Sequence, residues 1–235
     1  MKRSIQMLFL LIVVLCSSAF ADRRNYVWTY QYMTMPEGKT ELEFYQTTKL
    51  KTVDSWEYRF EVEHGLTDRW DISVYQIFTQ PEDGEFKWSS VQLRTRYRLG
   101  EEGQYFMDPL LYFEYNRKLN LKEKNKVEAK LILAKTVDNF NISINPVYEL
   151  FFAPGQKYEL GVDAGMSYQF HPKFIAGTEF IYRWESEDDE TESAAYFGPT
   201  LSFASGNWWY SMGVAFGLSD DSDDARVRFL MGVGI

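Results

Sequence analysis

The sequence predicts an all-β protein, a closed antiparallel transmembrane β-barrel of about 12 strands arranged as an up-and-down meander. Residues 56–63 read WEYRFEVE, a strict alternation of large apolar and charged side chains that only a strand separates onto two faces. The same alternation recurs along the chain. Aromatic residues make up 17% of the sequence and gather near the ends of the predicted strands, as in the interfacial girdles of membrane barrels.

The first 21 residues are predicted to be a signal peptide. A basic start, an apolar stretch over 7–15 and the small-x-small site AFA at 19–21 follow the order of a secretory leader, so cleavage is expected between Ala21 and Asp22. The apolar stretch is shorter than the roughly 20 residues that a membrane helix needs. Cys16 is the only cysteine, so the mature chain is expected to contain no disulfide.

Twelve stretches carry the strand pattern, beginning with a weakly patterned one at 40–49. In each of the others, alternate positions form an apolar face that would meet lipid. In chain order these stretches, with the apolar residues that identify them, are 56–64 (Trp56, Tyr58, Phe60, Val62), 70–79 (Trp70, Ile72, Val74), 88–99 (Val91, Leu93, Tyr97), 108–116 (Leu111, Phe113, Tyr115), 127–135 (Val127, Leu131, Leu133), 140–148 (Phe140, Ile142, Ile144), 158–170 (Leu160, Val162, Met166), 174–184 (Phe174, Phe180, Tyr182), 196–204 (Phe197, Leu201, Phe203), 208–218 (Trp208, Tyr210, Met212) and 225–235 (Val227, Phe229, Met231).

The connections alternate in length. Short turns are predicted after every second strand, and several longer polar loops lie between, notably 119–125, 185–193 and 219–224. Short periplasmic turns and longer external loops are typical of barrels in the outer membrane of Gram-negative bacteria. Residues 22–39 lie outside the strand count and are predicted to form a periplasmic or lumenal segment, which leaves 40–235 as the barrel. The residues assigned to the two aromatic girdles include Trp56, Trp70, Trp88, Trp184, Tyr196, Trp208 and Trp209.

The barrel must close, because lipid offers no partner for an unpaired strand edge. Its expected partners are outer-membrane lipid, the barrel-assembly machinery and small solutes. The predicted inward face is rich in charge, and two interpretations stay open: an ion-pair network that braces the wall, or a lining that selects solutes. The row Arg94, Arg96 and Arg98 is the strongest candidate for selectivity. The full set of predicted lumen-lining residues is Glu57, Arg59, Glu61, Arg94, Arg96, Arg98, Glu114, Glu128, Lys130, Asp163, Glu179 and Arg183.

Composition and motifs argue against other classes of function. A net charge of −9 does not fit nucleic-acid binding, which needs a basic surface. The sequence has no nucleophile elbow, zinc spacing or phosphate loop, and its two histidines, His64 and His171, fall at predicted short turns. We therefore predict no enzyme activity, no cofactor and no metal. The acidic loops at 185–192 and 220–224 could hold a divalent cation, but we interpret them as solvated loops.

Three segments resemble a known group of exported proteins. Residues 60–75, FEVEHGLTDRWDISVY, together with DPLLYFEY at 108–115 and VEAKLILAK at 127–135, are similar to outer-membrane barrels grouped with the MetA-pathway phenol-degradation proteins. The resemblance implies an outer-membrane location and a role in transport, and it carries over no catalytic residues. The chain departs from the usual barrel ending, because its last residue is Ile235 instead of an aromatic residue.

Together these features predict a passive channel or transporter for small polar, anionic or aromatic solutes. The first alternative is a structural barrel whose lumen is closed by ion pairs. The second is an outer-membrane hydrolase. The sequence leaves the solute and the oligomeric state open.

Overall fold

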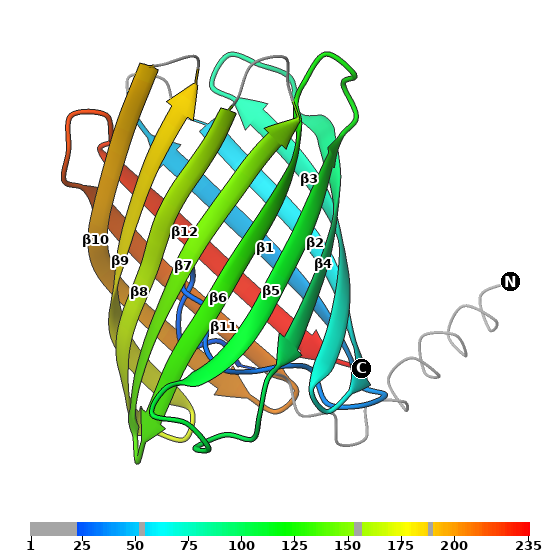
Figure 1. Cartoon of the computed structure of the whole chain (residues 1–235), viewed down its shortest axis with the longest axis vertical. Helices are drawn as coiled ribbons and strands as arrows, with labels where there is room; N and C mark the ends of the chain where they lie inside the picture. Colours follow the sequence, from blue (N-terminus) through cyan, green and yellow to red (C-terminus); the bar gives the residue numbers. More distant parts are fainter. Residues whose placement is uncertain (1–22, 52–54, 153–156, 188–189) are drawn as a thin grey trace, which may run out of the picture.

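The structure, a computed structural model, describes residues 23–51, 55–152, 157–187 and 190–235. In these ranges twelve antiparallel strands form a closed barrel, in which each strand pairs with its neighbours in the chain and β12 pairs with β1 (Figure 1). The predicted fold class and strand number are confirmed. The predicted signal peptide and its cleavage site lie outside the described residues. The strands are β1 (Thr40–Leu50), β2 (Ser55–Thr67), β3 (Trp70–Pro81), β4 (Lys87–Arg98), β5 (Asp108–Lys118), β6 (Asn125–Val137), β7 (Phe140–Phe152), β8 (Lys157–His171), β9 (Phe174–Glu187), β10 (Glu190–Ser205), β11 (Trp208–Gly217) and β12 (Ala225–Gly234).

The barrel has two distinct ends. We call the end where β1 begins and β12 ends the turn side, and the opposite end the loop side. Four of the five hairpin connections on the turn side contain two residues each, and positive φ angles at Asp138 (54°) and Gly206 (61°) close two of them. No helix in the described part of the chain has the length and apolar character needed to cross a membrane.

Two connections differ from the prediction. The link between β4 and β5 covers 99–107, so it is longer than the tight turn expected there. Most of the predicted acidic loop at 185–193 is strand, because β9 and β10 stay paired up to Glu187 and Glu190. Lys157 on the neighbouring β8 forms ion pairs with Glu185 and Glu187, which offsets the repulsion between carboxylates at this end of the sheet.

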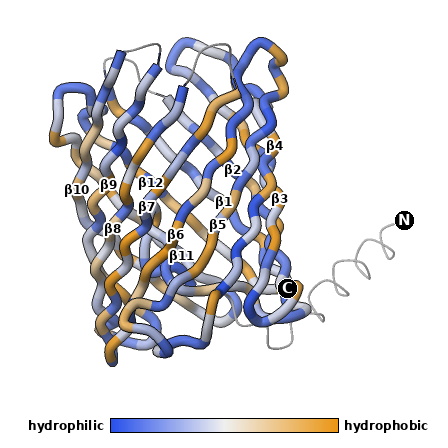
Figure 2. Tube along the Cα trace, in the orientation of Figure 1, coloured by the Kyte–Doolittle hydropathy of each residue, from blue (hydrophilic) through white to orange (hydrophobic). Residues whose placement is uncertain are grey.

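Hydrophobic and hydrophilic positions alternate along the strands (Figure 2), and the exposed outward-facing side chains are mainly large and apolar. Phe60, Leu93 and Phe113 expose 49%, 52% and 50% of their surface. So large an exposed apolar belt is expected of a surface that lipid covers. Aromatic pairs lie near each end, such as Phe174 with Phe203 on the turn side and Phe78 with Phe86 on the loop side.

Two of the residues assigned to the girdles face the interior instead. Trp209 is fully buried and donates a hydrogen bond from Nε1 to Glu41 (2.8 Å). Tyr196 is also fully buried, and its hydroxyl lies 3.2 Å from Asp223. Because successive side chains of a strand point to opposite faces, Trp208 and Trp209 cannot both face lipid, and Trp208 takes the outer position.

Residues 23–39 run through the turn-side half of the barrel interior before β1 begins (Figure 1). We call this stretch the lumenal segment. Near its start Arg23 donates a hydrogen bond to the carbonyl of Pro172 (2.8 Å), and near its end the Gly38 N–H donates to the carbonyl of Gly65 (2.9 Å). Val27 and Trp28 pack with buried apolar side chains of the wall, and Tyr32 packs with a second such cluster. The segment therefore crosses the lumen from the β8–β9 turn to the β2–β3 turn.

Candidate functional site: a charged cavity above the lumenal segment

One buried carboxylate anchors the lumenal segment to the wall. Glu179 on β9 is 1% exposed, and its two oxygens accept hydrogen bonds from the backbone N–H groups of Val27, Trp28 and Thr29 at 2.8, 2.8 and 2.7 Å. Successive N–H groups that converge in this way form an anion-binding concavity of the backbone. Glu179 thus fills a site that the segment's own backbone creates.

Asn145 on β7 forms a second anchor. Its side-chain amide accepts a hydrogen bond from the Tyr30 N–H (2.6 Å) and donates one to the Tyr30 carbonyl (3.0 Å). A buried backbone needs such partners, since the segment forms no ladder with a neighbouring strand at this point. The alternation of Tyr26, Trp28, Tyr30 and Tyr32 therefore does not produce a strand.

At two positions the wall has no room for a side chain beside the lumenal segment. A Cβ atom at Gly165 on β8 would lie 2.6 Å from the ring of Tyr26, and one at Gly213 on β11 would lie 2.6 Å from the Val27 Cγ2 atom. Both distances are well below a van der Waals contact. These two inward-facing glycines accommodate the lumenal segment.

Arg94 and Arg96 of the predicted arginine row lie beside the Tyr30 ring of this segment and are neutralised by carboxylates. The Arg94 guanidinium lies 2.9 Å from a carboxylate oxygen of Glu61 and also pairs with Glu63. Arg96 pairs with Asp71 (2.7 Å) and with Glu63. All of these side chains are almost completely buried. A buried cluster of this kind holds neighbouring strands together, and removal of one partner would leave an uncompensated charge.

The same cluster contains the closest approach to a metal site in the described residues. Carboxylate oxygens of Glu43, Glu61 and Glu63 lie within 4.8 Å of one another. Arg94 already supplies positive charge to Glu61 and Glu63, and the Tyr45 hydroxyl lies 2.6 and 2.7 Å from oxygens of Glu43 and Glu61. Side chains of the protein therefore already provide partners for all three carboxylates.

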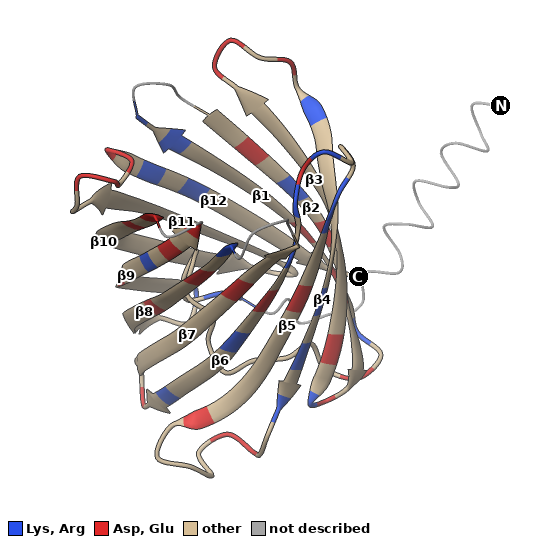
Figure 3. Cartoon of the chain, turned by 45° about the horizontal axis from the view of Figure 1, so that its top comes forward, with Lys and Arg blue, Asp and Glu red and all other residues tan. Residues whose placement is uncertain are grey.

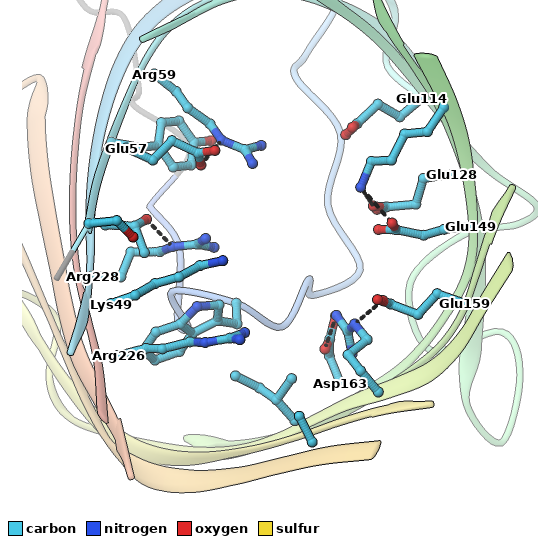
Figure 4. Close-up of a pocket in the computed structure, with 18 of the residues that line it drawn as sticks. Lys49, Glu57, Arg59, Glu114, Glu128, Glu149, Glu159, Asp163, Arg226 and Arg228 are labelled. Atoms are coloured by element: carbon cyan, nitrogen blue, oxygen red, sulfur yellow. Dashed lines mark hydrogen bonds and ion pairs between the residues drawn. The ribbon is translucent and has the colours of Figure 1, made fainter. Parts of the chain in front are cut away.

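On the loop side of the lumenal segment the barrel encloses a cavity of about 660 Å³ (Figure 4). Its floor includes Arg24, Trp28 and Tyr30 of the segment, and its lip includes Glu192 and Asp221 near the ends of the loop-side connections. This volume lies within the range of about 300–1,000 Å³ that is common for sites of small molecules. Most of the side chains between floor and lip are charged.

One wall of the cavity is basic. Lys49 on β1, Arg59 on β2, and Arg226 and Arg228 on β12 extend into it from adjacent strands (Figure 4). Figure 3 shows basic positions along β12. Arg59 pairs with Glu57 (2.7 Å) and Arg226 with Asp223 (2.6 Å). Burial alone would raise the pKa of Asp223, which lies in the loop, but the hydrogen bond and positive charge of Arg226, together with Lys49 and the Tyr196 hydroxyl, outweigh that effect, and the pKa falls below its usual value.

The opposite wall is acidic, and it is formed by β5 to β9. Lys126, Lys130 and Arg183 lie among the carboxylates and pair with all but one of them: Lys126 contacts Glu149 at 2.6 Å, and Arg183 contacts Asp163 at 2.7 Å. The exception, Glu114, accepts a hydrogen bond from the Tyr112 hydroxyl and has no basic group within 4 Å among the described residues. These five carboxylates are Glu114, Glu128, Glu149, Glu159 and Asp163, and a sixth, Glu185 near the loop-side end of β9, lines the cavity and pairs with Lys157.

The structure separates the predicted lumen-lining residues into two groups. Seven line the cavity: Glu57, Arg59, Glu114, Glu128, Lys130, Asp163 and Arg183. The other five lie elsewhere: Glu61, Arg94, Arg96 and Glu179 are buried against or below the lumenal segment, and Arg98 reaches the carbonyl of Asp68 at the turn side. Other charged residues that were not predicted also line the cavity, among them Arg24, Lys49, Lys126, Glu149, Arg226 and Arg228. Strand alternation could have identified the residues of β12, since Arg226 and Arg228 oppose the apolar face of Val227 and Phe229.

Neither histidine reaches the cavity. His64 lies 2.8 Å from the Thr40 hydroxyl and His171 accepts a hydrogen bond from the Lys173 N–H, both near the turn side. In the acidic connection at 218–224, Asp221 accepts a hydrogen bond from the Ser193 N–H (3.1 Å), and Asp223 binds Arg226. Two of its four carboxylates thus serve contacts within the protein. Asp188 and Asp189 of the other predicted acidic loop lie outside the described residues.

Comparison with known proteins identifies a family but no activity. Residues 102–225, just over half of the chain, match the model described as "Family of unknown function (DUF6662)". This is not the model of the phenol-degradation group that the sequence resembles, so that resemblance stays a prediction. No curated protein matches the chain.

Several solved structures share the fold. An outer-membrane channel of the COG4313 group from Pseudomonas putida F1 matches with a TM-score of 0.69 and 11% identity, over 89% of this chain and all of that one. The KdgM porin matches with a TM-score of 0.59 and 13% identity, over 82% of this chain and 98% of that one, and the NanC porin with 0.57 and 12%, over 83% and 98%. At these identities the similarity shows a shared barrel architecture and nothing beyond it.

Proposed function

Because the chain belongs to the family of unknown function DUF6662, whose description assigns no activity, we propose its function from the barrel itself: an outer-membrane channel for small polar solutes. In this proposal solutes enter the cavity from the loop side. The lumenal segment controls their passage to the turn side. The observation that carries the proposal is a charged cavity of about 660 Å³ within a closed barrel whose outer face is apolar.

The outer membrane of a Gram-negative bacterium is the proposed location. The belt around Phe60, Leu93 and Phe113 would be unfavourable in water and favourable in lipid. The solved structures with the same fold include an outer-membrane channel and two porins, which supports the same location. The orientation follows if the turn side faces the periplasm, as short turns do in such barrels.

The nature of the lining favours polar and charged solutes over apolar ones. The floor and walls combine guanidinium, ammonium and carboxylate groups with the rings of Trp28 and Tyr30. Among the solved structures with this fold, the KdgM porin has been described in complex with disordered oligogalacturonate. That complex supports passage of polar solutes through a barrel of this architecture. The phenol-degradation resemblance would add aromatic solutes to the range.

A closed structural barrel is the second candidate, because the lumenal segment and the cluster around Arg94 fill the turn-side half of the interior. Conductance distinguishes the two. The purified full-length protein is inserted into planar lipid bilayers, and current is recorded in a potassium chloride gradient. A channel gives discrete current steps, whereas a structural barrel gives none.

A variant with a loosened lumenal segment completes this test. Glu179→Ala should increase the current, since it removes the carboxylate that binds three backbone groups of the segment. Heat-modifiable migration on gels verifies that each variant forms a folded barrel. If neither the unsubstituted protein nor a folded Glu179→Ala variant conducts, the channel proposal is wrong and the structural role is supported.

A further inference from the structure

We propose that the cavity binds a small zwitterionic solute, with its anionic group on the β1–β12 wall and its cationic group on the β5–β9 wall. The inference rests on the proposed function, from which it takes that solutes reach the cavity from the loop side. Its basis is the separation of charge across the cavity (Figure 4). Such a lining distinguishes solutes by where their charges lie as well as by their net charge.

The basic wall holds positive charge that no carboxylate of the described residues offsets directly. Lys49 and Arg228 have no carboxylate within 4 Å among those residues. Arg228 is instead held by the Thr47 hydroxyl (2.9 Å) and lies 5.4 Å from the ring of Trp28. These contacts fix the guanidinium in place and leave its charge available. Lys49 is the strand partner of Arg226, so the cations form a ladder along the wall.

The floor adds a further donor next to this ladder. Arg24 stacks over the ring of Tyr30 at 4.2 Å and donates a hydrogen bond from Nη1 to the Tyr45 hydroxyl (3.2 Å). Its Nη2 group is buried and has no hydrogen-bond partner in the described protein. An unpartnered guanidinium N–H beside a cavity is a favourable place for an acceptor oxygen. A carboxylate, sulfonate or phosphate group would fit this side.

The acidic wall offers the complementary group. Six carboxylates of this wall line the cavity, against three basic side chains. Glu114 accepts a hydrogen bond from the Tyr112 hydroxyl and forms no ion pair with a described residue. In Figure 4 the Glu114 carboxylate points toward the cavity, across from Arg59 and Arg228. An ammonium group would gain a charge-assisted hydrogen bond there. A solute with a single charge can satisfy only one wall, whereas a zwitterion satisfies both.

Three probes of similar length test the proposal: 6-aminohexanoate, hexanoate and hexylammonium. Their binding to the detergent-solubilised full-length protein is measured by calorimetry at low salt. We expect 6-aminohexanoate to bind about tenfold more tightly than either singly charged probe, because it forms one additional ion pair, and a tenfold change corresponds to about 1.4 kcal/mol.

Two substitutions assign the walls. Arg228→Gln should weaken 6-aminohexanoate and hexanoate, and Glu114→Gln should weaken 6-aminohexanoate and hexylammonium while hexanoate stays unchanged. Neither residue has an ion-pair partner, so neither substitution leaves an uncompensated opposite charge, and both variants are expected to fold. Lys122→Gln and Glu102→Gln, on exposed residues outside the cavity, serve as matched controls.

The possible outcomes separate this proposal from the one on which it rests. Equal binding of 6-aminohexanoate and hexanoate that is insensitive to Glu114→Gln would overturn the zwitterion and indicate a simple anion site. Absence of binding by all three probes in a protein that conducts ions would also overturn it, with the channel intact. Wall-specific binding in a protein that gives no current would support the zwitterion site and refute the channel.

Discussion

Loss of the Glu179 carboxylate should release the lumenal segment from the barrel wall. We predict that Glu179→Ala detaches residues 27–29 from the wall while the barrel itself stays folded. The three N–H groups that the carboxylate accepts belong to the segment, and Glu179 on β9 is held in the sheet by its backbone. The substitution therefore weakens a contact between segment and wall and removes no strand pairing.

The size of the effect follows from the number and kind of hydrogen bonds lost. A hydrogen bond to a charged group contributes about 1.5–3 kcal/mol. Three of them share one carboxylate, and the released N–H groups regain water, so we expect about 4 kcal/mol in total. That corresponds to an increase of about a thousandfold in the population of the detached segment. Glu179→Gln, which keeps one acceptor oxygen, should have a smaller effect.

Thiol labelling reports the detached state. Thr29 is 1% exposed, so a Thr29→Cys side chain should react slowly with a maleimide in the otherwise unsubstituted protein and much faster together with Glu179→Ala. The unsubstituted protein serves as the blank, because Cys16 is the only native cysteine. Glu102→Ala, on an exposed residue of the turn side, is the matched control. Equal labelling rates with and without Glu179→Ala would refute the anchoring argument.

Three further substitutions test the wall by urea unfolding, two of them in detergent and the one at Leu93 in lipid vesicles. Arg94→Met should lower the free energy of unfolding by about 3–5 kcal/mol, because it leaves Glu61 and Glu63 buried without the Arg94 cation. Arg69→Met, in an exposed ion pair, should lower it by about 1 kcal/mol or less. Equal effects of the two substitutions would contradict a stabilising role for the buried ion pairs. Leu93→Arg in the apolar belt should cost about 2–4 kcal/mol in lipid vesicles, and a negligible loss would argue against a lipid-facing position. Trp209→Phe should cost about 1–3 kcal/mol through the lost hydrogen bond to buried Glu41, and a change near zero would show that this contact contributes little.

The barrel could be predicted from the sequence because its constraint is local and repeated. Every strand must show apolar side chains to lipid and polar ones to the interior, so a two-residue period identifies both the strands and their faces, as at Phe60 and Glu61. The same period does not predict the polarity of inward-facing residues where protein, and not water, fills the interior. Trp209 and Tyr196 are aromatic and face inward, where they belong to a buried apolar cluster that also contains Val27 and Trp28 of the lumenal segment.

Two inward-facing glycines are the sign of the lumenal segment in the sequence. Gly165 and Gly213 occupy inward positions where a wider lumen would accept larger side chains. Their meaning becomes clear only when Tyr26 and Val27 are placed against them. The contact joins residues more than 130 positions apart, and no local rule of the sequence connects them.

The distribution of charge shows most clearly what strand periodicity cannot decide. Periodicity places Arg94 and Arg96 on the inner face, but it does not say that Glu63, two strands away, reaches both of them across β3. That pairing depends on the stagger of strands and the curvature of the barrel. The cations that remain available, Lys49 and Arg228, are less conspicuous in the sequence because they come from opposite ends of the chain and meet only where β1 pairs with β12. The closure of the barrel, which the sequence did predict, therefore brings together the cations of the basic wall. This wall faces Glu114 across the cavity, and the resulting separation of charge is the basis for the proposed zwitterionic solute.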